Sequence, residues 1–362
     1  MSELNKKYIV HIVQPVSTTT IGGADMHVLD LVSLQKDRDD IIPIVCIRWN
    51  KTLKIRIESL GVVCFCGEEC QNSLEYVLFL NEKLREYNIS IVHSHGYDAN
   101  FQYLALRLLA IKRMSKVKFV ITSHGWIENT FALKLKTRLD FLTHSFADSH
   151  IVCAQNNLTR LRDNSINYYI PNGIVPFTYE KKYNERLRIG FVGRLSKEKR
   201  PDVFIEVARK IIAKNKNIMF NIYGEGDEIE SINNLIKLYN LEQNVCLMGQ
   251  KVNRSDIFSN IEILLLPSDT ESTPRVLIEA LSCGIPVVAT NVGDVSHIVI
   301  NNETGFLVNK RDVEGLTKCI FNLIEDDSLR KKMGENGIKH FIENLSALRM
   351  EQQVYNVYIN LL

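Results

Sequence analysis

The sequence predicts an α/β protein made of two doubly wound domains. Short apolar, β-branched runs alternate with longer amphipathic stretches along the chain, a pattern typical of parallel sheets covered by helices on both faces. A stretch with glycine, two prolines and a charged run interrupts this alternation near residues 173–186, which indicates an interdomain linker. A length of 362 residues suits two domains, each with its own core.

Ten strands are expected, five in each half. They lie at residues 7–13, 41–47, 89–95, 118–124 and 149–154, then at 186–193, 218–224, 244–249, 261–267 and 285–290. Helical patterns between them include residues 25–34, 73–87, 202–214 and 315–327. Right-handed crossovers place the following loops at the carboxyl ends of the strands, where doubly wound folds bind ligands.

Composition excludes several classes of protein. A formal net charge of +2 provides no basic field on the scale of nucleic-acid binding. Eight cysteines without a secretory signal indicate reduced thiols in a cytosol. No run approaches the roughly 20 apolar residues that a membrane helix needs. We therefore expect a cytoplasmic protein that is at most peripheral at the inner face of the cytoplasmic membrane.

No metal site is expected. Cys64, Cys66 and Cys70 form the densest cysteine group, CFCGEEC, but no second pair of cysteines or histidines follows nearby as zinc sites usually require. We interpret this group as a strand end followed by a polar loop. Asp37 and Asp39 lie in the polar run QKDRDD and are interpreted as a solvated turn.

Two glycine-containing turns follow predicted strands. Gly22 and Gly23 would let backbone N–H groups approach an anion, although a plain strand–helix turn explains them equally well. Gly224 and Gly226 in YGEGDEIE begin a dinucleotide fingerprint, but Ile229 stands where its third glycine would be. A nicotinamide-dependent dehydrogenase is therefore disfavoured.

The segment FVGRLSKEKRPDVF places cations directly after a buried strand. Arg194 and Lys199 lie in this loop, where side chains of a doubly wound fold reach ligands. Lys197 and Arg200 are interpreted as solvated.

Residues 267–290 combine two carboxylates with the start of a helix. The helix is expected to begin at Pro274 with Thr273 as N-cap, so Glu271 precedes it and Glu279 lies two turns inside. A helix N-terminus contributes about 0.3–2 kcal/mol to anion binding, and micromolar affinity needs roughly 8 kcal/mol. Charge-assisted bonds from the cationic loop, about 1.5–3 kcal/mol each, would supply much of the difference. Phosphates on the helix N–H groups and sugar hydroxyls on the carboxylates fit a nucleoside diphosphate.

Together these motifs resemble the GT-B glycosyltransferases of family 4. The matching pieces are IGGA, SHG, IPNGI, FVGRLSKEKR, IYGEGDEIE, ESTPRVLIE, SCGIPVVATNVGD and ETGFLV, which span nearly the whole chain. The resemblance implies two Rossmann-like domains that face each other across a cleft. An acceptor-binding domain would occupy residues 1–175, a nucleotide-sugar-binding domain residues 186–340, and a C-terminal helix at residues 341–362 would pack back on the first domain.

The resemblance also implies the reaction. Such enzymes transfer a hexosyl-type sugar, with retention of configuration and without a required metal or cofactor, from a nucleoside diphosphate sugar (UDP or GDP). The acceptor would be a glycan or a lipid-linked molecule, as in bacterial surface polysaccharide synthesis. Two alternatives stay open, a GT-B fold sugar-nucleotide 2-epimerase and a non-catalytic nucleotide-sugar-binding protein.

Roles for individual residues follow from the same resemblance. Arg194 and Lys199 would hold the diphosphate, Glu279 the ribose hydroxyls, and Glu271 and His124 the donor sugar. The remaining donor-binding positions would be Gly22, Gly23, Gly224, Thr273, Arg275 and Val276. The chain departs from the family at Ser272 and Thr273, where Gly-Phe or Gly-Leu is frequent, and at Val175, where aspartate is common. His95, at another strand end, is equally compatible with a structural and a functional role.

Two basic clusters accompany apolar residues in the first half. They comprise Lys112, Arg113, Lys116 and Lys118, and then Lys134, Lys136 and Arg138. Each cluster can be a solvated helix face, or part of an interfacial helix at an anionic membrane surface.

Overall fold

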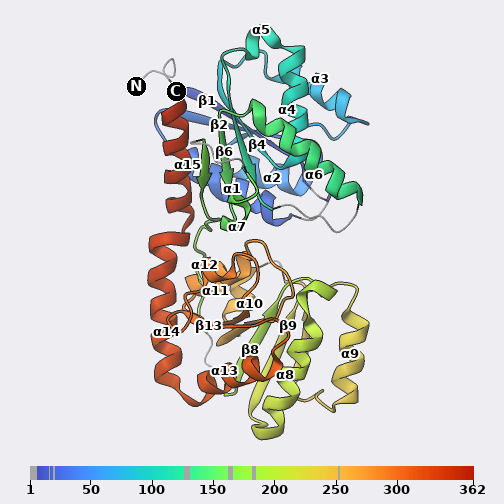
Figure 1. The fold of residues 1–362 in the computed structure, drawn as a ribbon, viewed down its shortest axis with the longest axis vertical. Helices are drawn as coiled ribbons and strands as arrows, with labels where there is room; N and C mark the ends of the chain where they lie inside the picture. The colour runs from blue at the N-terminus through green and yellow to red at the C-terminus, as the bar shows by residue number, and fades with distance from the viewer. Residues whose placement is uncertain are drawn as a thin grey trace. The chain divides into compact units, whose positions relative to one another are not determined.

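Each half of the chain folds around one parallel β-sheet in the computed structural model (Figure 1). Unit 1 contains Met1–Gly173 and Ala347–Leu362, and unit 2 contains Ile174–Ser346. The structure describes residues 6–15, 17–18, 21–125, 131–161, 166–181, 185–251 and 253–362.

Unit 1 is built on seven strands in the order β3-β2-β1-β4-β5-β6-β7. The strands are β1 (Lys7–Val13), β2 (Ile41–Ile47), β3 (Val63–Cys66), β4 (Ile89–His95), β5 (Lys118–Ser123), β6 (Ser149–Val152) and β7 (Asn167–Tyr169). Its helices are α1 (Gly23–Gln35), α2 (Lys51–Ser59), α3 (Ser73–Lys83), α4 (Tyr97–Leu109), α5 (Ile111–Met114), α6 (Phe131–Thr143), α7 (Gln155–Leu158) and α15 (Ala347–Leu361).

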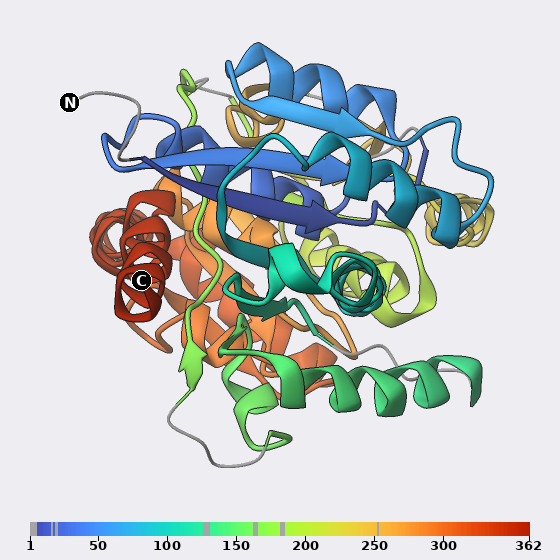
Figure 2. The ribbon, with the colours of Figure 1, turned by 90° about the horizontal axis from the view of Figure 1, so that it is seen from above.

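Alternation along the strands divides the unit 1 core into two faces. Val10 and Ile12 point toward α3 and α4, whereas Ile9 points toward α1 and α15. Figure 2 shows α15 end-on beside the strands of this sheet. The second face also carries His11, which lies between Val10 and Ile12 and is fully buried.

Unit 2 has six strands in the order β10-β9-β8-β11-β12-β13. They are β8 (Leu187–Val192), β9 (Ile218–Tyr223), β10 (Val245–Gly249), β11 (Ile263–Leu266), β12 (Val287–Thr290) and β13 (Gly305–Val308). The helices are α8 (Pro201–Lys214), α9 (Ile229–Leu238), α10 (Arg254–Phe258), α11 (Arg275–Ser282), α12 (Val295–Ile298), α13 (Val313–Glu325) and α14 (Asp327–His340). Helices α8, α9 and α13 cover one face of the sheet, and α10, α11 and α12 cover the other.

The boundaries of the units differ from those expected from sequence. Ile174 and Tyr179 belong to unit 2, because Ile174 is fully buried there and Tyr179 bonds to the Cys283 carbonyl. The second unit thus begins before residue 186. At the other end Phe341 and Leu345 stay in unit 2, where 4% and 1% of their surfaces are exposed. The helix that packs on unit 1 therefore starts at Ala347 and not at residue 341.

Helix α15 is fixed to unit 1 by polar and apolar contacts. Arg38 donates to both carboxylate oxygens of Glu351, at 2.6 and 2.7 Å, and Met350 and Val354 pack on the sheet. Tyr358 is fully buried and bonded to His93 at 2.6 Å. The last helix therefore completes the cover of the sheet face that carries the histidines.

All ten expected strands are present, most of them a residue or two shorter than the apolar runs. Strand β3 ends at Cys66 before a polar loop, and Asp37 and Asp39 are exposed in the turn after α1, both as expected. Strands β7 and β13 were not expected from the sequence.

Candidate functional site

In unit 2 the loops after β8 and β11 bring Lys199 and Glu271 into contact. Lys199 Nζ donates to both carboxylate oxygens of Glu271 at 2.7 Å, and Ser268 Oγ donates to one of them at 2.7 Å. The Glu271 side chain is 5% exposed. A carboxylate offers about four acceptor positions, so these three contacts hold Glu271 in place and leave room for about one further donor.

The same two loops are joined a second time. The Asp269 N–H donates to the Glu198 carbonyl at 2.8 Å, and the Arg200 guanidinium donates to Asp202 and to Asp269. The expectation that Arg200 is solvated is therefore wrong, because this side chain ties its own helix start to the β11 loop. Lys197 is exposed, as expected.

Gly224 and Gly226 allow the loop after β9 to lie directly on the loop after β8. Their φ angles are 146° and 157°, and a Cβ at either position would lie 1.9 Å from the Gly193 carbonyl oxygen or 2.3 Å from that of Leu195. Arg194, between these two residues, is exposed. The glycines thus support the cationic loop by close backbone packing.

Helix α11 begins one residue later than expected. Pro274 is the N-cap, with an extended ψ of 103°, so neither Pro274 as first helical residue nor Thr273 as N-cap is correct. Gly293, with φ of 57°, packs against the preceding loop, and a Cβ there would lie 1.9 Å from the Glu271 carbonyl oxygen. The Asp294 N–H donates to the Ser272 carbonyl at 3.0 Å. The start of α11 is thereby held from the β12 side.

Glu279 lies inside α11 and accepts a bond from a neighbouring helix. Arg254 Nε, on α10, is 3.0 Å from Glu279 Oε1, and the Glu279 side chain is 10% exposed. A pocket of about 570 Å³ adjoins Glu271 at the carboxyl ends of β11, β12 and β13. Sequence reasoning missed both Arg254 and the pocket residues Asn291, Asn309 and Lys310.

In unit 1 the predicted glycine turn closes on itself. The Gly22 N–H donates to Asp25 Oδ2 at 2.8 Å, and Gly23 is the first residue of α1. Burial raises the pKa of Asp25, and the bond from Gly22 opposes this effect. This N–H is therefore used within α1 in the structure.

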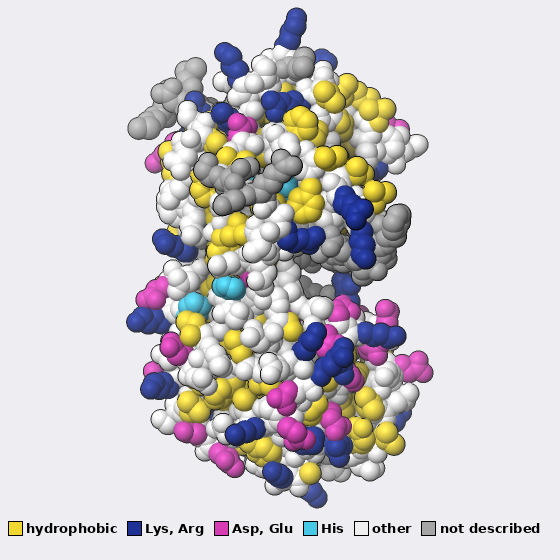
Figure 3. All heavy atoms as spheres, viewed as in Figure 1, with side chains coloured by type: hydrophobic (Ala, Val, Ile, Leu, Met, Phe, Trp, Pro, Cys, Tyr) yellow, Lys and Arg dark blue, Asp and Glu magenta, His cyan; other side chains and the backbone are white. Residues whose placement is uncertain are grey.

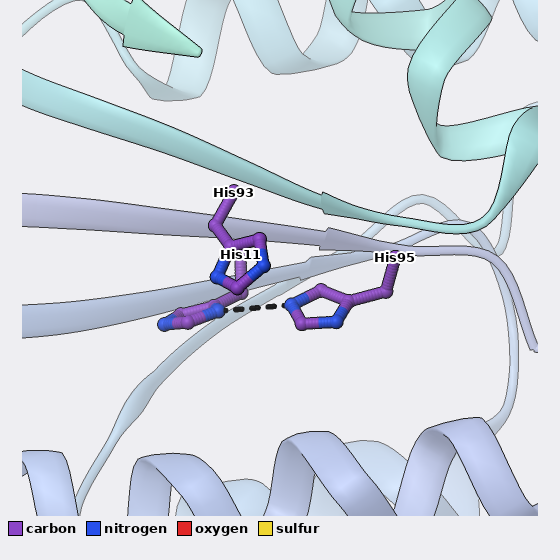
Figure 4. Close-up of side chains that lie close together, drawn as sticks. All are labelled: His11, His93 and His95. Atoms are coloured by element: carbon purple, nitrogen blue, oxygen red, sulfur yellow. Dashed lines mark hydrogen bonds between the residues drawn. The ribbon is translucent and has the colours of Figure 1, made fainter. Parts of the chain in front are cut away.

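Histidines of β1 and β4 lie close together, and a hydrogen bond joins His11 to His95 (Figure 4). His11 Nδ1 is 3.1 Å from His95 Nε2, and His11 Nε2 is 2.8 Å from Gln35 Oε1. His124 directly follows β5, and its ring stacks on that of His95, with centroids 5.8 Å apart, and meets the His27 ring edge-on at 4.6 Å. The structure therefore brings His124 and His95 together.

Among the residues that the structure describes, two groups of side chains have a spacing that a metal ion could bridge. Their ligand atoms lie within 4.8 Å of one another, in the sets His11, His93 and His95, and His27, His124 and Cys153. In the first set hydrogen bonds already account for both nitrogens of His11 and His93. The His93 nitrogens lie 2.6 Å from the Tyr358 hydroxyl and 2.6 Å from that of Thr122.

Comparison with known proteins identifies the family. Residues 21–176 match the family model Glycosyltransferase Family 4, and residues 178–340 match Glycosyl transferases group 1. Anabaena HepE in complex with UDP-glucose has the same fold, with a TM-score of 0.81 at 18% identity over 98% of this chain and 99% of that chain. An uncharacterized glycosyltransferase of Haemophilus influenzae is 30% identical over 64% of this chain and 69% of its own length. The chain is a GT-B glycosyltransferase of family 4.

This glycosyltransferase also resembles a Staphylococcus aureus protein named capsular polysaccharide biosynthesis glycosyltransferase CapM. The two are 29% identical over 60% of this chain. The chain thus covers only 59% of the length of CapM. Within the described parts of the glycosyltransferase, no helix combines the length and apolar character needed to cross a membrane.

The buried histidines predict how the stability of the glycosyltransferase depends on pH. Burial lowers the pKa of His11 from 6.5 to about 4. It lowers the pKa of His150 to about 3, with a smaller contribution from His144. Between these values and 6.5 the unfolded state binds more protons, so the free energy of unfolding falls as the pH falls below 6.5.

At about pH 5 each of these two histidines is expected to lower the free energy of unfolding of unit 1 by roughly 2 kcal/mol relative to neutral pH. Urea unfolding followed by tryptophan fluorescence measures this loss, because both tryptophans, Trp49 and Trp126, precede Gly173. Equal unfolding midpoints at about pH 7.5 and pH 5 would contradict the assignment of neutral, buried imidazoles.

Proposed function

We propose that this glycosyltransferase moves a hexosyl-type sugar from a UDP- or GDP-linked donor to a glycan or lipid-linked acceptor. Transfer retains configuration and needs no metal ion. The observation that carries the proposal is the contact between Lys199 and Glu271 next to the start of α11. There a fixed ammonium, a fixed carboxylate and a helix N-terminus lie together, and these groups match a diphosphate and a sugar.

The diphosphate is assigned to the cationic side of this arrangement. The N-cap residue Pro274 has no side chain that can cap α11, and the first N–H groups of a helix attract anions. Lys199 is 24% exposed, which leaves part of its ammonium accessible, and Arg194 is exposed in the same loop. Charge that develops on the leaving phosphate is stabilised by such preorganised donors.

The two glutamates are assigned to hydroxyl groups at opposite ends of the donor. Three hydrogen bonds from Lys199 and Ser268 hold Glu271, which favours a role in accepting a hydrogen bond from a sugar hydroxyl and opposes one as a covalent nucleophile. This supports retention by attack from the leaving-group side without a covalent intermediate. Glu279, oriented by Arg254, accepts bonds from the ribose.

A thermal-shift panel of UDP-, GDP- and ADP-sugars tests the donor. A ligand at 100 times its Kd stabilises the folded state by about 2.7 kcal/mol, which corresponds to a shift of a few degrees in a protein of this size. We expect UDP- or GDP-sugars to give such a shift. Equal melting temperatures with all three nucleotide sugars would contradict the proposal. In a separate product analysis, an epimerised donor formed without any acceptor would also contradict it.

Helix α6 favours an acceptor at a membrane surface. It buries the polar residues Thr137 and Asp140, each 1% exposed, and exposes Leu135, Leu139 and Leu142 by 49%, 45% and 64%. A normal surface helix buries its apolar side chains and exposes its polar ones, and these residues of α6 do the reverse. Apolar residues gathered on one exposed face mark a surface for membranes or partners.

Charge around α6 selects an anionic lipid surface. Lys134 and Arg138 are exposed on the helix, whereas Lys136 pairs with Asp98 at 2.6 Å and Lys118 with Asp148 at 3.2 Å. Hydrophobic side chains lie beside lysines and arginines on this part of the surface (Figure 3). Exposed leucines flanked by cations are typical of helices that rest on anionic bilayers.

Vesicle sedimentation tests this orientation. The variant with Leu139→Gln and Leu142→Gln is expected to bind vesicles of anionic phospholipid about tenfold more weakly, because two apolar anchors are lost. Leu238→Gln is the matched control, since Leu238 is 69% exposed on α9 of unit 2. No binding of the wild-type protein at low salt would argue for a soluble acceptor.

A further inference from the structure

A row of polar side chains crosses one face of the unit 1 sheet. In register, His11 on β1 pairs with His93 on β4, and His95 pairs with Thr122 on β5. Because side chains alternate along a strand, these four residues share one face, and His124, two positions after Thr122, continues the row. The row therefore runs from the interior of unit 1 to the carboxyl end of β5.

Hydrogen bonds along this row fix the ring of His95. Gln35 Oε1 accepts from the Nε2–H of His11, so the neutral His11 ring keeps a lone pair on Nδ1. That lone pair accepts from the Nε2–H of His95 at 3.1 Å. Burial lowers the pKa of both rings, to about 4 for His11, so both are neutral near pH 7. Gln35 thus sets the tautomers of His11 and His95 and the direction of the hydrogen bond between them.

His95 in turn contacts His124. The two rings stack with centroids 5.8 Å apart and planes 22° apart. His27, whose Nδ1 lies 2.9 Å from Asn172 Oδ1, meets the His124 ring at 75°. His124 therefore packs against two imidazoles, each of them held by its own side-chain hydrogen bond.

We propose that His95 is a positioning residue that sets the ring plane of His124 for its contact with the donor sugar. This inference rests on the proposed function and on the role that the family resemblance implies for His124, contact with the donor sugar. A hydrogen bond from an imidazole weakens steeply when its angle departs from linearity. The His124 ring is also restrained at Nδ1, which lies 3.7 Å from Cys153 Sγ. A change in the ring plane would weaken the bond to a sugar hydroxyl, and the stacked His95 ring opposes such a change.

An energetic cost at His95 supports a role beyond packing. Its Nδ1 is buried and has no hydrogen-bond partner among the described residues. Leaving such a group unpaired destabilises the folded state, a cost that an apolar side chain at this position would avoid. The His11 bond and the stacking on His124 give a reason for an imidazole at a position where packing alone favours an apolar ring.

A double-mutant cycle on kcat tests the inference. We expect His124→Ala to lower kcat about 100-fold, and His95→Phe, which keeps a ring but loses the bond to His11, to lower it about tenfold. The double variant is expected to match His124→Ala alone, because His95 acts only through His124. His95→Gln, which can still donate to His11 but lacks the ring, is expected to lower kcat as well.

His150→Phe provides the matched control. His150 is equally buried, pairs with Ile121 in register and bonds to Ser123, so it lies on the opposite face of the sheet. Its kcat is expected to stay within about twofold of wild type. Additive losses in the double variant, or wild-type kcat in both folded His95 variants, would overturn the positioning role. Wild-type kcat in His124→Ala would instead overturn the proposed contact of His124 with the donor.

Discussion

Replacing Lys199 or Glu271 with alanine is expected to lower the transfer rate about 100- to 1,000-fold, which is typical for loss of one preorganised electrostatic group. Both bonds from Lys199 end on Glu271, so either change leaves the other side chain without its partner. The fold is expected to persist, because Ser268 still bonds to Glu271 and Lys199 is partly exposed. Steady-state transfer assays on the identified donor, with thermal unfolding alongside, measure both effects.

The matched control is Lys210→Ala. Lys210 forms an ion pair of 2.5 Å with Glu314 in the same unit, with side-chain exposures of 29% and 78%. Such a surface pair contributes little, about 0–1 kcal/mol, so transfer is expected to remain at the wild-type rate. Wild-type turnover in Lys199→Ala or Glu271→Ala would refute the roles assigned to them.

Gly293→Ala is expected to weaken donor binding about tenfold or more, a change of about 1.4 kcal/mol. A Cβ there would lie 1.9 Å from the Glu271 carbonyl oxygen, closer than any real contact, so the β12 loop must move away from the start of α11. That movement displaces Glu271 and the helix N-terminus together. Titration of the nucleotide sugar by calorimetry measures the loss, and chemical unfolding measures the accompanying destabilisation.

Gly249→Ala separates the steric effect from backbone strain. Gly249 has φ of 66°, close to the 57° of Gly293, but a Cβ there would meet nothing within 4 Å. An alanine at positive φ costs about 1–2 kcal/mol in either case. Donor affinity is expected to fall only for Gly293→Ala, and an equal fall in both variants would show that strain, not contact with Glu271, is responsible.

The fold was predictable because its sheets are buried on both faces. Parallel strands read as continuous apolar runs, so runs such as residues 7–13 and 41–47 coincide with β1 and β2. Strands β7 and β13 were not predicted, and β7, with the residues Asn-Tyr-Tyr, contains no aliphatic side chain. The break between the units was predicted near residues 173–186, and the first unit ends at Gly173. The glycine and prolines there indicate a turn but do not show that Ile174 joins the core of unit 2.

The site was predictable only as far as its residues lie next to a strand end. Lys199 was proposed because it lies in a loop after a strand, where parallel sheets carry their binding loops, and the structure shows it in contact with Glu271. The partners of Glu279 and His11 were not predicted, because they come from other parts of the chain. Arg254 reaches Glu279 from another helix, and Gln35 reaches His11 from the end of α1.

Two local predictions were wrong for identifiable reasons. Thr273 was expected to cap α11 because threonine is a frequent N-cap, but Pro274 has an extended ψ and takes that position. Arg200 was expected to be solvated because it lies in a charged loop. In the structure Asp269, contributed by the β11 loop, provides an acidic partner that the neighbouring sequence does not reveal.

The central claim is that a diphosphate binds at the start of α11 beside the loop that carries Arg194 and Lys199. A crystal structure with the nucleotide sugar selected by the thermal-shift panel tests it most directly. We expect phosphate oxygens within about 3 Å of Lys199 Nζ and of the first N–H groups of α11, with the sugar on Glu271. A diphosphate bound elsewhere, with Lys199 still bonded only to Glu271, would contradict the account.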